Sequence, residues 1–275
     1  MSAFMKSKMR ILERRIILFA VLVIASLITP VFAQGISATL LTEENKQKIE
    51  LAVWRYAIDT PLLLETIDWF RDLTRNSQES AAIAELSRLE FMIAQLERDK
   101  NRRVQLFERC IVIADRSLAL NANDVRGLFW KAVAMGKMAE DSGMVNALRM
   151  LRPMEKMLLK VVALDEKYEN AGAHRALGRM YHKLPGFPVS FGNNQKALTH
   201  LKQAHELFPR DVMTRAFYAE VLYDEGWQAE ARRHADFVLA TPIDEEDALE
   251  FAEYVDIALG VVKKTGGSNI KLGNY

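Results

Sequence analysis

Small and large apolar side chains recur in a fixed order between residues 173 and 211. Along the chain they are Leu177, Gly178, Tyr181, Ala197, Leu201 and Ala204, and Pro209 closes the segment. Small residues at helical spacing let two helices approach closely, and the larger residues between them fill the seam. The order therefore predicts a tightly packed pair of antiparallel helices.

The same order returns once more after the proline. The second copy consists of Tyr218, Ala219, Leu222, Ala231, Ala235 and Val238, followed by Pro242. Its spacing is close to the roughly 34 residues of a tetratricopeptide (TPR) repeat. Degenerate units precede it, with first helices expected over roughly 81–98 and 124–138 and second helices around 110–120 and 154–164. We expect an all-α, TPR-like solenoid of helical hairpins, and such solenoids build surfaces for partners more often than active sites.

Two of the units are longer than the repeat spacing allows. About ten extra residues lie between Ala132 and Met154, and they include the helix-breaking Pro153. A second insertion follows Tyr181 and runs from Leu184 to Gly192. Insertions in solenoids usually form loops on one face, often the binding face.

The second insertion is apolar and stiffened by proline. It carries two prolines and two phenylalanines, and such a segment is costly to leave in water unless it packs on something. Two interpretations stay open: Phe187 and Phe191 pack on the protein's own helices, or they contact a partner or ligand. The candidate binding residues are Tyr181, His182, Pro185, Phe187 and Phe191.

The segments Leu177–Pro188 and Phe191–Leu198 resemble the T-component family of TRAP transporters. Members of that family are periplasm-facing, all-helical proteins with cryptic TPR repeats and a stretched loop inside one unit. The resemblance implies association with an extracytoplasmic solute-binding protein. The stretch Leu177-Gly178-Arg179 is also similar to the eukaryotic regulator of microtubule dynamics family.

The amino-terminal segment has the pattern of a secretory signal peptide. Five basic residues precede an apolar run from Ile16 to Ile28, and a small residue, Ala33, ends the segment. This pattern predicts a signal peptide over residues 1–33 with cleavage after Ala33. A retained anchor is the alternative, although a membrane span needs about 20 apolar residues. No cysteine lies near residue 33, so we expect a periplasmic or secreted protein that is not a lipoprotein and meets the membrane only transiently.

The remaining chain is expected to form one helical domain over residues 34–264, with a flexible tail over 265–275. Extra amino-terminal helices precede the clear repeats, and a final helix that begins near the acidic run Asp244–Asp247 caps them. Without residues 1–33 the chain holds 32 basic and 35 acidic side chains, a net charge of −3. This charge argues against nucleic acid as a partner.

Sequence motifs of catalysis are absent. The chain has no His-Glu-x-x-His, no Gly-x-Ser-x-Gly and no phosphate-binding Gly-x-x-x-x-Gly-Lys-Ser/Thr motif. No two of its five histidines stand at i, i+4, so no metal site, cofactor or enzymatic activity is expected. The lone Cys110 is expected to be a buried, inert thiol. The four tryptophans, at positions 54, 69, 130 and 227, are expected in the core or in helix seams.

Two functional classes remain. The first is an exported TPR scaffold that binds a protein, with a TRAP-type solute-binding component as the candidate partner. The alternative is a helical carrier that encloses a small apolar ligand or a lipid. A large enclosed cavity beside Tyr181 and the loop phenylalanines would favour the carrier, and an exposed groove would favour the scaffold. Homo-oligomerisation stays open in both cases.

Overall fold

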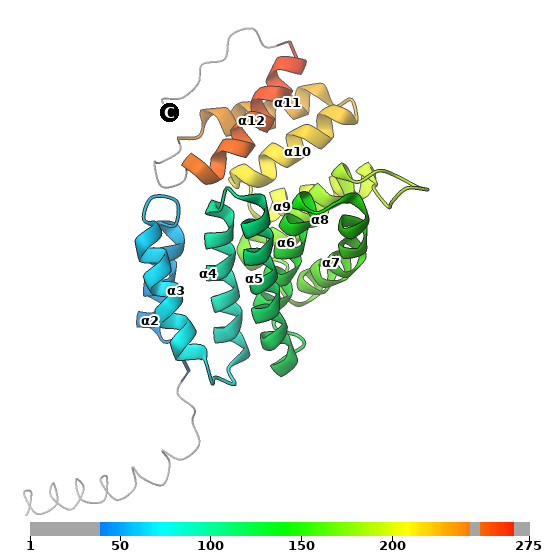
Figure 1. The fold of residues 1–275 in the computed structure, drawn as a ribbon. Coiled ribbons are helices and arrows are strands. Elements are labelled where there is room, and N and C mark those ends of the chain that lie inside the picture. The colour runs from blue at the N-terminus through cyan, green and yellow to red at the C-terminus, as the bar shows by residue number, and fades with distance from the viewer. Residues whose placement is uncertain (1–38, 243–247, 267–275) are drawn as a thin grey trace, which may run out of the picture. The chain divides into compact units, whose positions relative to one another are not determined.

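The computed structural model describes residues 39–242 and 248–266 (Figure 1). The expected signal peptide, the acidic run Asp244–Asp247 and most of the expected tail lie outside the described residues. The residues from Leu40 onward belong to one compact unit. Its helices are α2 (Glu43–Trp54), α3 (Thr60–Thr74), α4 (Ser80–Leu96), α5 (Lys100–Leu120), α6 (Val125–Asp141), α7 (Met144–Leu164), α8 (Tyr168–Lys183), α9 (Asn194–Leu207), α10 (Val212–Asp224), α11 (Gln228–Ala240) and α12 (Ala248–Lys264).

Every regular element in the described residues is a helix, and consecutive helices pack as hairpins. The pairs are α4 with α5, α6 with α7, α8 with α9, and α10 with α11 (Figure 1). At the amino-terminal end α2 and α3 pack on one another and on α4, and at the other end α12 packs on both α10 and α11. The predicted all-α, TPR-like solenoid with added terminal helices is confirmed.

The seam between α8 and α9 forms through the small residues that the sequence singled out. Ala197 and Ala204 are fully buried, as is Leu201 between them. A Cβ atom at Gly178 would overlap the side chain of Leu201. Glycine at this position therefore permits the close approach of the two helices, and the large residue opposite fills the remaining space.

Polar side chains at the amino-terminal ends fix where several helices begin. In each case a carboxylate or amide oxygen accepts a hydrogen bond from the backbone N–H three residues ahead, which satisfies a group that has no partner inside the helix. The capping residues are Asp59 for α3, Asp99 for α5, Asp124 for α6, Asn193 for α9 and Asp211 for α10.

The first long unit differs from the sequence-based expectation. Its extra residues lengthen α6 and α7 instead of forming a loop, and the connection is only Ser142 and Gly143. Pro153 does not end a helix but lies inside α7. The helix continues through the proline because a buried apolar face extends across it, and burial of such side chains outweighs one missing backbone hydrogen bond. That face consists of Leu151, Met154, Leu158 and Val161.

The tryptophans divide between core and surface. Trp130 is buried, whereas Trp54 is 52% exposed and Trp227 is 56% exposed. The prediction of a core or seam position is therefore wrong for these two. Trp54 is the last residue of α2 and Trp227 immediately precedes α11, so both stand at helix ends, outside the seams where paired helices cover one another.

Cys110 is fully buried on α5, as predicted. Burial raises the pKa of its thiol to about 12. The Ser87 hydroxyl lies 3.1 Å from the Cys110 sulfur and donates to the Cys110 carbonyl at 3.0 Å, which ties α4 to α5. A thiol in this state is a packing residue and not a nucleophile.

Candidate functional site

The beginning of α8 contains a left-handed turn. Glu169, Asn170 and Ala171 have φ angles of 50°, 53° and 59°. Non-glycine residues lose roughly 1–2 kcal/mol each in this conformation. Arg175 offsets part of this cost, because its guanidinium donates to the carbonyl oxygens of Asn170 at 3.2 Å and of Glu169 at 3.4 Å. The right-handed part of α8 follows this turn.

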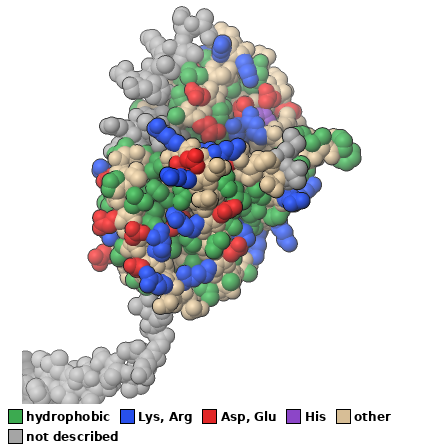
Figure 2. Space-filling model, viewed as in Figure 1, with side chains coloured by type: hydrophobic (Ala, Val, Ile, Leu, Met, Phe, Trp, Pro, Cys, Tyr) green, Lys and Arg blue, Asp and Glu red, His purple; other side chains and the backbone are tan. Residues whose placement is uncertain are grey.

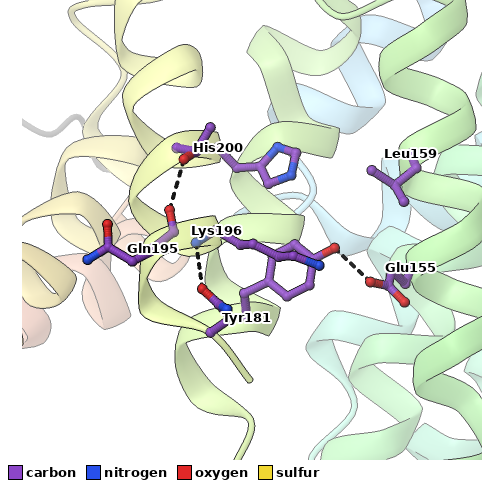
Figure 3. Close-up of a pocket in the computed structure, with 8 residues that line it drawn as sticks. Glu155, Leu159, Tyr181, Gln195, Lys196 and His200 are labelled. Carbon is purple, nitrogen blue, oxygen red and sulfur yellow. Dashed lines mark hydrogen bonds between the residues drawn. The ribbon is translucent and has the colours of Figure 1, made fainter. Parts of the chain in front are cut away.

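An open pocket of about 450 Å³ lies between α7 and α9, beside Tyr181 of α8 (Figure 3). Three helices therefore supply its walls, and they belong to two successive hairpins. The lining residues are Glu155 and Leu159 from α7, Tyr181 from α8, and Asn193, Gln195, Lys196, Thr199 and His200 from the start of α9.

On the α7 side, one carboxylate joins two helices. The phenol of Tyr181 donates to Oε1 of Glu155 at 2.7 Å, and Arg152 donates to Oε2 at 2.8 Å. Burial, together with the bond to Glu155, raises the pKa of the Tyr181 phenol. The phenol therefore stays protonated and remains a hydrogen-bond donor at neutral pH. Arg152 also covers the ring of Phe191, with 3.8 Å between the guanidinium carbon and the ring centroid.

On the α9 side, Lys196 and His200 both contact the ring of Tyr181. The ammonium of Lys196 lies 5.1 Å from the centroid of the Tyr181 ring, and the imidazole of His200 stacks on the same ring at 5.7 Å. Nδ1 of His200 shares a hydrogen bond of 2.9 Å with Nδ1 of His174. Burial, reinforced by the charges of His174 and Lys196, lowers the pKa of His200 to about 4. His200 is therefore neutral at pH 7.

The loop between α8 and α9 begins and ends on backbone hydrogen bonds. The N–H of Gly192 donates to the carbonyl of Pro185 at 2.9 Å, and the N–H of Asn193 donates to the carbonyl of Tyr181 at 2.8 Å. A Cβ atom at Gly192 would overlap the carbonyl group of Leu184. The two ends of the loop can approach this closely only because residue 192 is glycine, and the loop base is thereby fixed.

The tip of this loop presents apolar side chains to solvent. Phe187 is 94% exposed and Val189 is also exposed. Figure 2 shows an apolar group projecting from the body at the place where Figure 1 draws the loop between α8 and α9. Phe191 behaves differently, because it packs edge-on to Tyr181 with ring centroids 6.2 Å apart. Phe191 therefore packs on the protein itself, whereas Phe187 is exposed.

The structure brings some of the predicted site residues together and separates others. The rings of Tyr181 and Phe191 pack on one another, whereas Pro185 and Phe187 lie on the exposed part of the loop. His182 faces α10 instead, where its Nε2 lies 2.8 Å from Oδ2 of Asp224 and its side chain is largely buried.

Sequence reasoning missed the contributions of Glu155 and Lys196 to the pocket and gave His200 no specific role. Lys196 and His200 are four residues apart on one helix, and this spacing could have indicated a shared face. Glu155 and Tyr181 are 26 residues apart on different helices, so no local pattern connects them.

The described residues lack both a metal-binding cluster and a helix suited to span a membrane. No cluster of three or more His, Cys, Asp or Glu side chains there has the arrangement of a metal site. Over the same residues, no helix combines the length and apolar character that a bilayer span requires.

A solved TPR protein shows the same fold as this chain. A thermophilic TPR protein of Thermus thermophilus superposes with a TM-score of 0.56 at 19% sequence identity, over 78% of this chain and 99% of that protein. The TPR protein YrrB, described as having an unusual peptide-binding site, gives a TM-score of 0.45 at 18% identity over 71% and 90% of the two chains. MamA gives 0.44 at 13% identity over 85% and 100%.

Comparison with curated proteins found no match. A model of the TRAP transporter T-component family matches residues 90–255, which is more than half of the 275-residue chain and includes both long units and the pocket. The chain therefore belongs to the TRAP transporter T-component family.

Proposed function

We propose that this protein is an exported scaffold that binds an extracytoplasmic solute-binding protein of a TRAP-type transporter through the loop Leu184–Gly192. The TPR fold and the family support a non-catalytic protein-interaction scaffold linked to TRAP transporters. The partner and the contact surface are inferred from the geometry of the loop.

The exposure of Phe187 carries the proposal. A phenylalanine on a flexible segment would lose conformational freedom on binding. Phe187 is exposed on a loop whose base is already fixed by the hydrogen bond between Pro185 and Gly192, so the entropy cost of binding is smaller. Aromatic side chains on preorganised surfaces supply a large part of the free energy at protein interfaces. The five candidate residues then divide into contact residues, Pro185 and Phe187, and supporting residues, Tyr181, His182 and Phe191.

The export part of the proposal assigns residues 1–33 to a signal peptide and residues 34–264 to the mature helical domain, followed by a short tail. Amino-terminal sequencing of the protein purified from the cell envelope tests it. We expect the mature chain to begin at Gln34. A chain that still begins at Met1 would contradict cleavage and would favour the retained anchor.

The carrier alternative gains no support at the pocket. The space beside Tyr181 is open to solvent, and the exposed Phe187 is not among the residues that line it. An enclosed apolar ligand needs a cavity that buries most of its surface.

The binding proposal is tested with the solute-binding protein of the TRAP transporter from the same organism, immobilised for biolayer interferometry. Replacing Phe187 by Ala should weaken binding by more than tenfold, because truncation of a central aromatic contact typically costs about 2 kcal/mol or more. Val112→Ala is the control, since Val112 is an exposed apolar residue on α5, outside the loop.

Equal affinity of the Phe187→Ala and Val112→Ala proteins would contradict the role of the loop. Failure of the unsubstituted protein to bind the solute-binding protein at micromolar concentration would contradict the proposed partner.

A further inference from the structure

We propose that the pocket between α7 and α9 binds a carboxylate group, with Lys196 and His200 as the two donors. The inference goes beyond the proposed function, because it assigns a ligand chemistry to the pocket and does not require the loop to contact a protein. It follows from which polar groups of the pocket already have partners and which do not.

Lys196 is the cation of the pocket. Its ammonium lies over the ring of Tyr181, and no carboxylate of the described residues comes within ion-pair distance of it. Figure 3 shows the side chain extending from α9 toward α7 across this ring. Lys202, on the same helix, differs because it points to solvent and lies 3.8 Å from Glu206.

His200 supplies a second donor, and its tautomer follows from the burial of His174. The hydrogen bond between the two Nδ1 atoms needs one N–H, and Nε2 of His174 is buried without a partner among the described residues. An unpaired buried lone pair costs less than an unpaired buried N–H. His174 therefore donates from Nδ1, His200 accepts at Nδ1, and the hydrogen of His200 is on Nε2.

The carboxylate of the pocket already has its partners. Both oxygens of Glu155 accept bonds, from Tyr181 and from Arg152. The Thr199 hydroxyl donates to the carbonyl of Gln195, and the side-chain oxygen of Asn193 accepts from the backbone N–H of Lys196. The charged group of the pocket that has no counter-charge among the described residues is the Lys196 ammonium, so the complementary ligand group carries negative charge.

A carboxylate fits this set better than a phosphate. The pocket offers one ammonium and one neutral imidazole, and the Glu155 carboxylate on the opposite wall is offset by a single guanidinium. A doubly charged group would meet more repulsion than one cation offsets, whereas a carboxylate balances Lys196 alone. The Tyr181 ring and Leu159 line the same pocket and suit an apolar group attached to the carboxylate. Its volume of about 450 Å³ is in the range of small-ligand sites.

The test is a titration of the purified full-length protein with propionate, observed through the ¹⁵N resonance of Nε2 in His200. Propionamide, which has the same shape and no charge, is the matched control ligand. We expect a saturable shift with propionate and none with propionamide. Lys196→Gln should weaken propionate binding about tenfold, because a charge-assisted hydrogen bond is lost, and Lys202→Gln should leave it unchanged.

The carboxylate could belong to a protein chain end or to a small organic acid. An eight-residue peptide that ends in a free carboxylate, and its amidated form, distinguish these two sources. Binding of the free peptide at least tenfold tighter than propionate, with loss on amidation, would support the proposal with a protein chain end as ligand. Equal binding of peptide and propionate would support it with a small organic acid.

The proposal is overturned if propionate gives no saturable shift, if propionamide shifts the resonance equally, or if Lys196→Gln and Lys202→Gln behave alike. Failure here is distinguishable from failure of the proposed function, because Phe187→Ala should leave the propionate titration unchanged. Lys196 is exposed, so its substitution leaves the fold intact.

Discussion

The phenol of Tyr181 donates a 2.7 Å hydrogen bond to the carboxylate of Glu155, and this bond connects α8 to α7 across two successive hairpins. Glu155 is buried and receives its second donor from Arg152. The bond therefore does two things: it satisfies a buried carboxylate and it holds two walls of the pocket at a fixed separation.

Replacing Tyr181 by Phe should destabilise the protein by about 1–3 kcal/mol, because it leaves one oxygen of the buried Glu155 without its donor. Urea unfolding measures the change. Tyr223→Phe is the control, because the hydroxyl of the half-buried Tyr223 has no hydrogen bond to a described residue. Unchanged stability of the Tyr181→Phe protein would show that the bond contributes nothing to the fold.

Replacing glycine by alanine should have opposite effects on stability inside the α8–α9 seam and on the open face of α12. Gly178→Ala should cost about 1–3 kcal/mol, because the new methyl group overlaps Leu201 and forces the helices apart. Gly260→Ala on α12 should instead stabilise by roughly 0.5–1 kcal/mol, since no atom lies within 4 Å of the added Cβ and alanine favours the helix. Thermal unfolding that moved in the same direction for both proteins would contradict the account of the seam.

The carboxylate of Glu90 is fully buried, so replacing its arginine partners should destabilise the protein more than replacing Glu90 itself. Arg71 donates to one oxygen of Glu90 at 2.7 Å, and Arg109 donates to the other at 2.8 Å. Replacing both arginines by Met strands a buried charge and should cost about 3–5 kcal/mol. Glu90→Gln leaves the two guanidinium groups partly in water and should cost less. Chemical denaturation of the two proteins compares them directly, and the reverse order would be inconsistent with Glu90 as the buried charge.

Stability should fall as pH decreases from about 6.5 to about 4. Burial lowers the pKa of His174, His200, His205 and His234, with His200 and His234 at about 4. An unfolded histidine has a pKa of about 6.5, so the unfolded state binds more protons in this window. The contribution of these histidines is complete above pH 6.5 and is lost as pH falls toward their folded-state pKa values.

Urea midpoints at pH 7.5 and pH 5.0 measure this loss. We expect a lower midpoint at pH 5.0, and a smaller decrease for His200→Gln than for the unsubstituted protein. A midpoint that rises on acidification would contradict the assignment of neutral, buried imidazoles.

The sequence predicted those parts of the fold that depend on local spacing. Gly178, Ala197 and Ala204 mark a helix seam because small residues at helical intervals have one dominant use, and all three positions confirmed it. The start of α6 could also be predicted from local sequence, because Asp124 stands directly before an apolar helical pattern and caps this helix.

The sequence was misleading where a residue's role depends on distant neighbours. Pro153 is tolerated inside α7 because the apolar face around it is buried by other helices, which no local rule reveals. Trp54 and Trp227 were assigned to the interior by residue type, yet each stands at a helix end. The pocket was missed as a unit because Glu155 and Tyr181 are 26 residues apart on different helices, and only the folded chain brings them together.

The central claim is that Phe187 contacts a solute-binding protein in the cell envelope. Replacing Phe187 by the photo-cross-linker p-benzoylphenylalanine, irradiating intact cells and analysing the adducts by mass spectrometry tests this contact without purification, and Val112 replaced in the same way is the control. We predict an adduct with the solute-binding component of a TRAP transporter from position 187 and none from position 112. No adduct at position 187, or the same adduct from both positions, would contradict the account.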